Sequence, residues 1–593
     1  MTVQDTFAAT LVDEWVRAGV TDAVVAPGSR STPMAVALAG DGRLRLHVVV
    51  DERSAAFFAL GLGLSSGRPA VVLTTSGTAA VELHPAIVEA HHAGVPLLAC
   101  TADRPPELHG VGAPQTVEQE RLFQGVVRAA LAPGVPDAAT SGAWRSLAAR
   151  AFLAATAGPA GPGPVHLNLA FRDPLTGSDG PAALPTGRPG NAPWHQRFPA
   201  VAAPPAELVA ELAQGGKRGV IVAGAGAGAP AAVHAVAAAL GWPLLADPRS
   251  GCRLPEPATV ATADALLRVR FATEMRPDVV LRLGAPWASR VVGDWLAGLD
   301  APQYLVDPHG TWLDPSRTAA VSVAADPTTF VLGVAEAANL RPAPADWAAR
   351  WLEAERAAQA AIDAQLSDLL ADGGVNEPAI ARSLVDCLPT GSALVVSSSM
   401  PIRDVEWYGR PRPGLRVLSN RGANGIDGVV STALGVAAAG PSPTFALVGD
   451  LAFLHDASGL RAGAASDRPA ACTVVVVDNG GGGIFSFLPQ AGTLAPDAFE
   501  RLLGTPHGLD LLAVARAYGA SAEEAHSIKD LVAALEPPGK PDGAHVVVVR
   551  TDRQSNVEVH DRLHDAVAAS LNELAARASK EKGAGSPDPS VDA

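Results

Sequence analysis

Short apolar runs alternate with longer segments of helical periodicity along the first part of the chain. Runs at 22–26, 46–50, 69–74 and 96–101 have the length and the apolar, largely β-branched character of buried strands. Between them, the spacing of apolar positions predicts helices over 6–18, 33–39, 53–65 and 78–92. Strands that alternate with helices at this rhythm predict a doubly wound parallel sheet.

The same alternation returns twice more, over 218–338 and 376–575. A stretch rich in Pro and Gly, 172–206, predicts a linker, and a second proline-containing break precedes a helix from about 346 to 370. We therefore predict an α/β protein of three doubly wound parallel-sheet domains. Their expected ranges are 1–185, 200–340 and 346–578, and residues 579–593 are expected to form a disordered tail.

Composition narrows the possible partners. The chain has 593 residues, of which 48% are apolar, and a net charge of −15, which argues against nucleic acid or an anionic membrane. The four cysteines are scattered, no leader pattern is seen, and no apolar run reaches the roughly 18 residues that span a bilayer. We expect a cytoplasmic protein without membrane insertion, in which an anionic substrate must meet a local cluster of arginines.

Two buried-strand patterns in the third domain end in candidate metal ligands. The run 445–448 ends in Gly449-Asp450-Leu451, and the run 472–477 ends in Asp478-Asn479 and a glycine run that leads into Ile484-Phe485. Because parallel strands present their carboxyl ends at one edge, Asp450, the Asn479 side chain and the Gly481 carbonyl could bind Mg²⁺ on a diphosphate. The glycines would let the backbone approach the phosphates closely.

The spacing of these two loops, 26 residues from 452 to 477, resembles the thiamine diphosphate motif. That motif reads Gly-Asp-Gly, about 26 residues, and Asn-Asn. Leu451 replaces its last glycine and Asp478 replaces its first asparagine. The resemblance implies thiamine diphosphate with Mg²⁺ or Mn²⁺ as cofactors, whereas the simpler alternative is two ordinary strand-to-loop turns.

Glu52 is the candidate catalytic residue. It follows the strand 46–50 and opens the next helix. Thiamine diphosphate loses its C2 proton to its own aminopyrimidine nitrogen, and a carboxylate on the opposite ring nitrogen promotes the tautomer that accepts it. Glu52 is placed for this role, although an acid in the first turn of a helix also stabilises the helix dipole.

Arginines also recur at strand ends. Arg30, Arg104, Arg403 and Arg421 all follow predicted strands, and four such cations in an acidic protein favour a polyanionic substrate. Thr75-Ser76-Gly77 ends another strand and could either cap a helix or contact the cofactor.

The ordered set of motifs resembles one family from about residue 5 to 565. The segments that carry the resemblance are Ala26–Pro33, Asp51-Glu52-Arg53, Thr75–Ala79, Ala102–Pro105, Ser419–Gly422, Gly425–Gly428 and Gly449-Asp450-Leu451. Together they resemble the 2-succinyl-5-enolpyruvyl-6-hydroxy-3-cyclohexene-1-carboxylate synthases, thiamine diphosphate-dependent transferases of menaquinone biosynthesis. The resemblance implies decarboxylation of 2-oxoglutarate and 1,4-addition of the succinyl carbanion equivalent to isochorismate, with release of CO₂.

The same resemblance implies a set of site residues. Those expected to bind substrate are Ser29, Arg30, Arg104, Gln115, Ser399, Arg403 and Arg421, with Arg290 as the middle-domain cation. Those expected to bind the cofactor are Glu52, Thr75, Ser76, Gly77, Ile426, Gly449, Asp450, Leu451, Asn479, Gly481, Gly483, Ile484, Phe485 and Leu488. Pro114 stands where the family usually has Asn, which puts one polar contact in doubt.

The resemblance further implies a homodimer or homotetramer with active sites between subunits. Two alternatives stay open at this point. One is another thiamine diphosphate enzyme, such as an acetohydroxyacid synthase or a 2-oxoacid decarboxylase. The other is a regulator that binds the cofactor without catalysis, which would be expected to lose Glu52 or the metal ligands.

Overall fold

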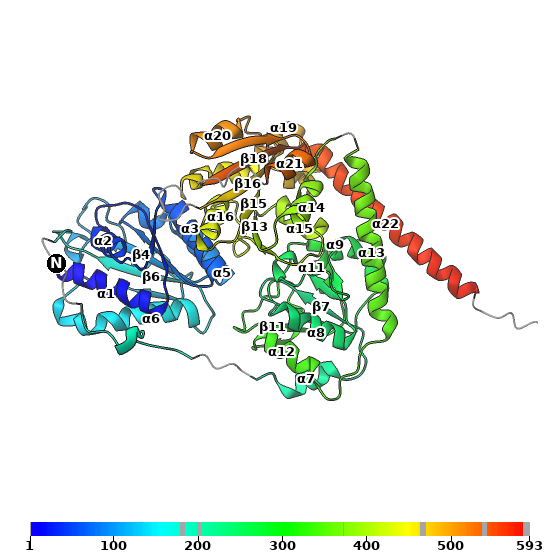
Figure 1. Cartoon of the computed structure of the whole chain (residues 1–593), viewed down its shortest axis with the longest axis horizontal. Coiled ribbons are helices and arrows are strands. Elements are labelled where there is room, and N and C mark those ends of the chain that lie inside the picture. Colours follow the sequence, from blue (N-terminus) through cyan, green and yellow to red (C-terminus); the bar gives the residue numbers. More distant parts are fainter. Residues whose placement is uncertain are drawn as a thin grey trace, which may run out of the picture.

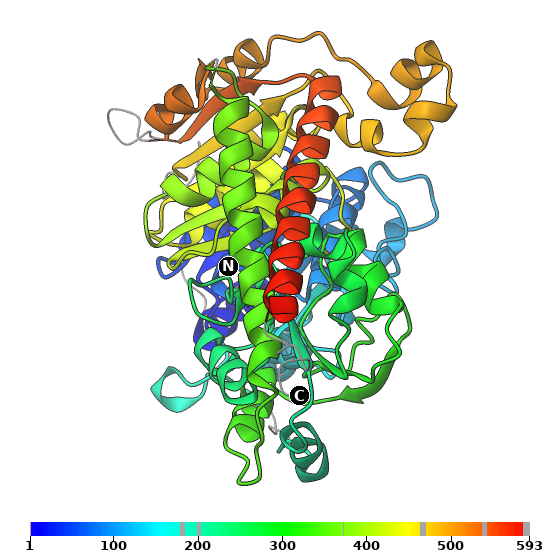
Figure 2. The ribbon, with the colours of Figure 1, turned by 90° about the vertical axis from the view of Figure 1, so that its right-hand side faces the viewer.

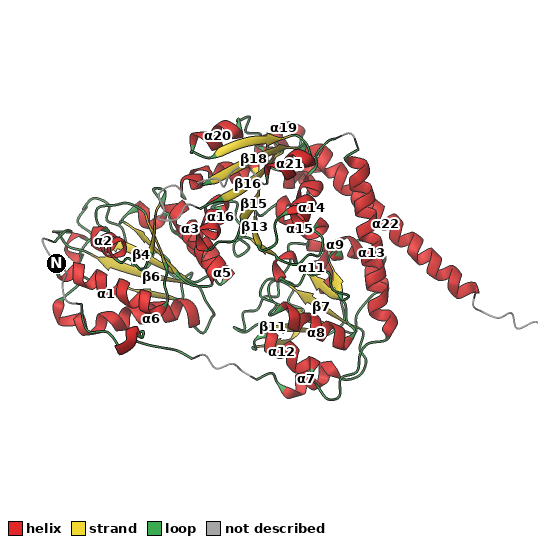
Figure 3. Ribbon diagram, viewed as in Figure 1, coloured by secondary structure: helices red, strands yellow, loops and turns green. Residues whose placement is uncertain are grey.

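Three parallel sheets, each covered by helices, form three lobes of the chain in the computed structural model (Figure 1; Figure 3). The structure describes residues 2–177, 184–198, 203–371, 373–462, 470–535 and 543–584. Within these ranges every sheet has six strands, and every strand pair is parallel. This confirms the predicted fold class.

The first lobe holds the sheet β2-β1-β3-β4-β6-β5. Its strands are β1 Asp22–Val25, β2 Arg45–Val48, β3 Ala70–Thr74, β4 Leu97–Asp103, β5 Ala129–Leu131 and β6 Pro164–Ala170. Its helices are α1 Val3–Ala18, α2 Thr32–Gly40, α3 Glu52–Ser66, α4 Thr78–Val81, α5 His84–Ala93 and α6 Trp144–Ala157. The single helix expected over 78–92 is wrong, because Pro85 lacks an N–H and a new helix begins around it.

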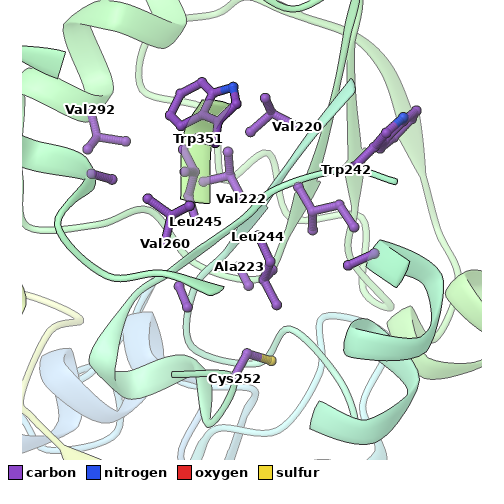
Figure 4. Packing of buried hydrophobic residues seen from close by; sticks show 14 of the residues in the cluster. Val220, Val222, Ala223, Trp242, Leu244, Leu245, Cys252, Val260, Val292 and Trp351 are labelled. Atoms are coloured by element: carbon purple, nitrogen blue, oxygen red, sulfur yellow. The ribbon is translucent and has the colours of Figure 1, made fainter. Parts of the chain in front are cut away.

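The second lobe holds the sheet β12-β11-β10-β7-β8-β9. Its strands are β7 Gly219–Ala223, β8 Leu244–Ala246, β9 Thr259–Val260, β10 Val279–Leu283, β11 Gln303–Val306 and β12 Ala319–Val323. Its helices are α7 Ala206–Ala213, α8 Pro230–Leu240, α9 Ala263–Leu267, α10 Phe271–Glu274, α11 Arg290–Ala297 and α12 Pro327–Ala335. Figure 4 shows its core, where Val220, Val222 and Leu245 pack beside Trp351.

The third lobe holds the sheet β14-β13-β15-β16-β18-β17. Its strands are β13 Ser392–Val396, β14 Leu415–Leu418, β15 Thr444–Gly449, β16 Cys472–Asp478, β17 Ser521–Ala525 and β18 Ala544–Arg550. Its helices are α14 Glu377–Cys387, α15 Met400–Tyr408, α16 Val429–Ala439, α17 Asp450–His455, α18 Gln490–Thr493, α19 Pro496–Phe499, α20 Leu511–Ala517 and α21 Ile528–Ala534.

Two long helices tie the second lobe to the third. α13, Ala345–Leu369, and α22, Arg553–Ala584, run side by side (Figure 2). Trp351 of α13 and Leu563 of α22 belong to one continuous buried cluster. The prediction of a disordered tail from residue 579 is wrong for its first residues, because α22 continues to Ala584. Ala, Lys and Glu, which make up most of this stretch, favour helix. Residues 585–593 lie outside the described part.

Within the described ranges, no helix combines the length and the apolar character needed to cross a membrane.

The first and third lobes meet through a close helix crossing of α3 on α16. A Cβ added at Gly61 would lie 2.1 Å from the Thr432 carbonyl oxygen, and one added at Gly435 would lie 2.1 Å from that of Phe58. Neither helix can therefore carry a side chain at the crossing. Because α3 begins at Glu52, this contact sets where the candidate catalytic carboxylate lies.

We expect Gly61→Ala to destabilise the protein by about 1–3 kcal/mol, because the added methyl meets backbone rather than a movable side chain. Calorimetric unfolding would show the loss as a lower midpoint. Gly293→Ala is the matched control, since Gly293 also lies inside a helix but has no atom within 4 Å of its added Cβ. An unchanged midpoint in Gly61→Ala would contradict the close crossing.

Candidate functional site

The third sheet changes winding direction between β13 and β15, and a cavity of about 350 Å³ lies at their carboxyl ends. Such switch points are where open α/β sheets bind ligands. The structure brings twelve of the sequence-predicted residues to this cavity: Ser399, Arg403, Arg421, Ile426, Gly449, Asp450, Leu451, Asn479, Gly481, Gly483, Ile484 and Phe485. Leu488 is outside the cavity lining, just past the 3₁₀ turn Gly483–Phe487, with 38% of its surface exposed.

Asp450 joins the loops that follow β15 and β16. It is only 2% exposed; its Oδ1 accepts from the Leu451 N–H at 2.6 Å, and its Oδ2 accepts from the Gly481 N–H at 2.8 Å. Gly481 has φ +145°, and a Cβ there would lie 2.0 Å from the Gly504 carbonyl oxygen. Burial raises the pKa of Asp450, and a bound cation would offset that cost.

The side-chain amide of Asn479 is hydrogen-bonded through its amino group but not, among the described residues, through its oxygen. Its Nδ2 donates to Glu377 Oε1 at 2.9 Å, whereas its Oδ1 is buried without a partner among the described residues. A buried carboxylate, a buried amide oxygen without a partner and a glycine-rich backbone form the donor set that Mg²⁺ or Mn²⁺ takes on a diphosphate. The residues present therefore fit a divalent cation.

A second acidic grouping overlaps this set. Ligand atoms of Asp450, Asp478 and His507 lie within 4.8 Å of one another. His507 Nδ1 accepts the Leu509 N–H at 3.0 Å, so a neutral ring carries its proton on Nε2, which lies 3.3 Å from Asp478 Oδ1 and 3.6 Å from Asp450 Oδ2. The His507 ring thus turns an N–H rather than a lone pair toward this grouping, although that N–H makes no hydrogen bond with the described residues.

Arginines line the wall of the cavity beside α15. Arg403 Nη1 donates to the Ser399 carbonyl oxygen at 2.6 Å, and Ser399 itself has φ +76°, a strained conformation for a residue with a side chain. Arg421 makes no hydrogen bond or ion pair with any residue that the structure describes. Burial lowers the pKa of Arg421, and the charges of Arg249 and Arg403 lower it further. An anion in the cavity would relieve both effects.

The first lobe carries a separate polar cluster at its own switch point, between β1 and β3. A Cβ added at Gly28, after β1, would lie 2.3 Å from the Thr75 Cβ, after β3, so the two loops touch. Arg104 donates to Ser76 Oγ and, at 3.5 Å, to Gln115 Oε1. The structure thus brings together Thr75, Ser76, Gly77, Arg104 and Gln115, with exposed Ser29 on the adjoining loop.

Arg30 belongs to this cluster but already has partners. Its Nη1 donates to the Phe171 carbonyl oxygen at 2.9 Å and to Asp173 Oδ2 at 3.2 Å, while its Nε finds no partner in the part of the chain that the structure describes. Burial lowers the pKa of Arg104, and the charge of Arg30 lowers it further. Each guanidinium group disfavours the positive charge of the other, so a carboxylate bound at this edge of the sheet would be stabilised by both.

Glu52 is held by its neighbours, and its carboxylate is left free. Arg53 Nη2 donates to the His455 carbonyl oxygen at 2.7 Å, and Ser458 Oγ donates to Asp51 Oδ2 at 2.9 Å. The Glu52 carboxylate has no hydrogen bond or ion pair with the described residues, and the residue is partly exposed at the start of α3. The contacts fix its backbone to the third lobe and leave its side chain available.

Arg290 is not brought to the cavity. It opens α11 with 91% of its side chain exposed and pairs with Asp294 at 3.3 Å. Nor does any described residue of the first lobe line the cavity, so Glu52 and Asp450 do not share a pocket within one chain.

Sequence reasoning missed two groups at the site. Glu377 lines the cavity although it lies 102 residues before Asn479, and no local pattern signals it. Burial raises the pKa of Glu377 to about 7, with Asp404 adding to the rise. His507 follows the glycine run by more than twenty residues and could have been found only by asking which later loop returns to it.

Comparison with known families defines the class. Residues 1–122 match the family described as thiamine pyrophosphate enzyme, N-terminal TPP binding domain. Residues 189–396 match the middle domain of thiamine pyrophosphate, and residues 405–549 match the C-terminal TPP binding domain. The chain is a thiamine diphosphate enzyme, and the three matches follow the order of the three lobes, with the middle match extending over α14 and β13 of the third.

Full-length relatives narrow the class further. Three are named 2-succinyl-5-enolpyruvyl-6-hydroxy-3-cyclohexene-1-carboxylate synthase. That of Thermobifida fusca is 45% identical over 95% of this chain and 99% of its own length, that of Myxococcus xanthus is 42% identical over 96% and 98%, and that of Geobacillus kaustophilus is 40% identical over 95% and 98%. The chain belongs to the 2-succinyl-5-enolpyruvyl-6-hydroxy-3-cyclohexene-1-carboxylate synthase family, as its motifs predicted.

Proposed function

We propose that this protein decarboxylates 2-oxoglutarate with thiamine diphosphate and adds the succinyl carbanion equivalent to isochorismate, in menaquinone biosynthesis. The observation that carries the proposal is the Arg421 guanidinium, which has no partner among the described residues and lines the same cavity as Arg403, Asp450 and Asn479. Both substrates are dicarboxylates, which such a pair of cations can hold. The full-length relatives carry the name of this activity.

Different residues would bind the metal, the cofactor and the substrates. Asp450, the Asn479 oxygen and the Gly481 carbonyl would hold Mg²⁺ or Mn²⁺, and the loops after β13 and β16 would hold the diphosphate. When bound, thiamine diphosphate supplies the carbon nucleophile and the electron sink for decarboxylation. Glu52 would hold the proton on the aminopyrimidine ring nitrogen. Arg403, Arg421 and Arg104 would orient the carboxylates and stabilise charge that develops on them.

The direct test is an assay with isochorismate, 2-oxoglutarate, thiamine diphosphate and Mg²⁺, following CO₂ and the isochorismate absorbance. We expect both signals to depend on both substrates. CO₂ release from pyruvate, with no use of isochorismate, would favour an acetohydroxyacid synthase or a related decarboxylase instead.

We expect Arg421→Gln to raise the KM of one or both substrates about 10- to 100-fold, since a charged hydrogen bond contributes about 1.5–3 kcal/mol. Steady-state kinetics would measure the change. Arg350→Gln is the matched control, because Arg350 is half exposed and its one ion pair with the described residues is to Glu274 at 3.7 Å. An Arg421→Gln enzyme with wild-type KM values would remove this residue from substrate binding.

We also propose that two chains together form each active site. The two polar clusters do not share a pocket within one chain, and both lobes carry exposed apolar side chains. In the first lobe these include Val50, just after β2, and Val111 and Val117, on either side of Gln115 in the sequence. In the third lobe they include Ile426, which lines the cavity, and Leu488, Leu494, Leu502 and Leu509. A second copy that covered these surfaces would set the first lobe of one chain against the third lobe of the other.

Mixing two inactive variants tests this arrangement. In a dimer of Glu52→Gln and Asp450→Asn chains, one site combines the intact Glu52 of one chain with the intact Asp450 of the other. Random association should therefore restore about a quarter of wild-type activity. If each site lay within one chain, the mixture would stay inactive.

The four cysteines are all free, and three of them are buried. This supports a reducing compartment, and we propose the cytoplasm.

A further inference from the structure

Glu377 is a buried carboxylate whose place in the site has no local sequence signal. It is the first residue of α14 and is only 4% exposed. Its Oε1 accepts from Asn479 Nδ2 at 2.9 Å and from Thr551 Oγ1 at 3.1 Å. These two donors directly follow the neighbouring strands β16 and β18, so one carboxylate joins two strand ends behind the cavity.

The hydrogen bond from Asn479 decides which end of its amide faces the cavity. An amide has a donor end and an acceptor end, and its terminal torsion allows both orientations. An ionised carboxylate only accepts, so Glu377 takes the amino end and turns Oδ1 the other way. That oxygen is buried and has no partner among the described residues, while Asn479 lines the cavity beside Asp450.

We propose that Glu377 is the positioning residue of the cation site, which turns the Asn479 oxygen toward the metal. The inference rests on the cation site of the proposed function and extends it by one residue. Thr551 supports the arrangement, because its hydroxyl donates to the same Oε1 and its N–H donates to the Asp478 carbonyl oxygen at 2.9 Å. Partners that orient a metal ligand are worth about 10- to 100-fold in metal affinity.

A purely structural role for Glu377 makes a different prediction. A carboxylate that only packed α14 against the sheet would change the unfolding temperature and leave the cation dissociation constant alone. An orienting carboxylate changes the cation dissociation constant, and a high cation concentration restores the maximal rate.

The experiment measures Mn²⁺ binding to the full-length protein with thiamine diphosphate present, by the electron paramagnetic resonance signal of free Mn²⁺. At about pH 8, where carboxylates are ionised, we expect Glu377→Gln to raise the Mn²⁺ dissociation constant about 10- to 100-fold. Glutamine can offer either end to Asn479 and so loses the selection. Calorimetric unfolding without cofactor should show a midpoint close to wild type. A wild-type Mn²⁺ dissociation constant in Glu377→Gln would overturn the inference.

Two further variants separate the possible failures. Asn479→Ala should itself weaken Mn²⁺ binding, and adding Glu377→Gln to it should cost nothing more, because one residue acts through the other. If Asn479→Ala binds Mn²⁺ as tightly as the wild type, the proposed cation site is wrong. If Asn479→Ala binds Mn²⁺ weakly but Glu377→Gln binds it as tightly as the wild type, the cation site stands and the orienting role of Glu377 is wrong. Additive losses would also reject that role.

Glu355→Gln is the matched control for loss of a buried carboxylate. Glu355 is 6% exposed in α13 and accepts from the Thr262 N–H and from Gln359, both at 2.9 Å, and also from the Thr262 hydroxyl. Its partners belong to the second lobe and to α13, away from the cavity. We expect this variant to lower the midpoint of thermal unfolding and to keep the wild-type Mn²⁺ dissociation constant.

Thr551→Val is the variant to use if Glu377→Gln proves too unstable to isolate. It removes the other hydrogen-bond donor to Glu377 and should also raise the Mn²⁺ dissociation constant. An unchanged dissociation constant would count against the inference.

Discussion

Replacing Glu52 by glutamine is expected to reduce turnover about 10²- to 10⁴-fold and to leave the fold intact. The glutamine amide keeps the size of the side chain and loses the negative charge that favours a proton on the aminopyrimidine nitrogen. The fold should survive because the anchoring contacts belong to Asp51 and Arg53, while the Glu52 side chain has no partner among the described residues.

Two measurements check this result separately. Steady-state kinetics gives the loss of turnover, and the rate at which bound thiamine diphosphate exchanges its C2 proton for deuterium reports activation of the cofactor alone. Both should fall together in Glu52→Gln. Glu82→Gln is the control, since Glu82 is an exposed carboxylate in the same lobe, next to α4. Unchanged product formation in Glu52→Gln would remove this residue from the mechanism.

Replacing Asp450 by asparagine is expected to weaken cation binding by more than the roughly 100-fold that loss of an orienting partner can cause. The change removes the charged ligand and also puts an amino group against the Leu451 or Gly481 N–H, both of which now donate to the carboxylate. Activity and cation-dependent binding of thiamine diphosphate should therefore fall together.

Calorimetric titration of thiamine diphosphate with and without Mg²⁺ measures the loss. In the wild type, Mg²⁺ should tighten binding strongly; in Asp450→Asn the two titrations should nearly coincide. Asp497→Asn is the control, because Asp497 is an exposed carboxylate in α19, outside the cavity lining. Cation-dependent cofactor binding that survived in Asp450→Asn would place the metal elsewhere.

The site was predictable where it depends on strand ends. Asp450, Asn479 and Arg403 each follow a short apolar run, and a parallel sheet brings the ends of such runs to one edge whatever the loops between them do. The same reasoning placed Arg104 at a strand end, where the structure has it donate to Ser76. Gln115, which meets Arg104 and Gly77, was offered only by the family resemblance. Arg290 was offered only by the family resemblance and stays a prediction, since within one chain its side chain is exposed and pairs with Asp294.

By itself, the sequence determined the three parallel sheets, the family and the loops that carry the candidate ligands, because strand length, glycine-dependent turns and motif spacing are local properties of the chain. The tertiary structure alone decided that Glu377 meets Asn479 and how the first lobe packs on the third, with Glu52 and Asp450 in separate pockets of one chain. These relations depend on packing between distant segments, such as the Gly61 and Gly435 crossing, whose geometry is set by atoms far apart in the sequence.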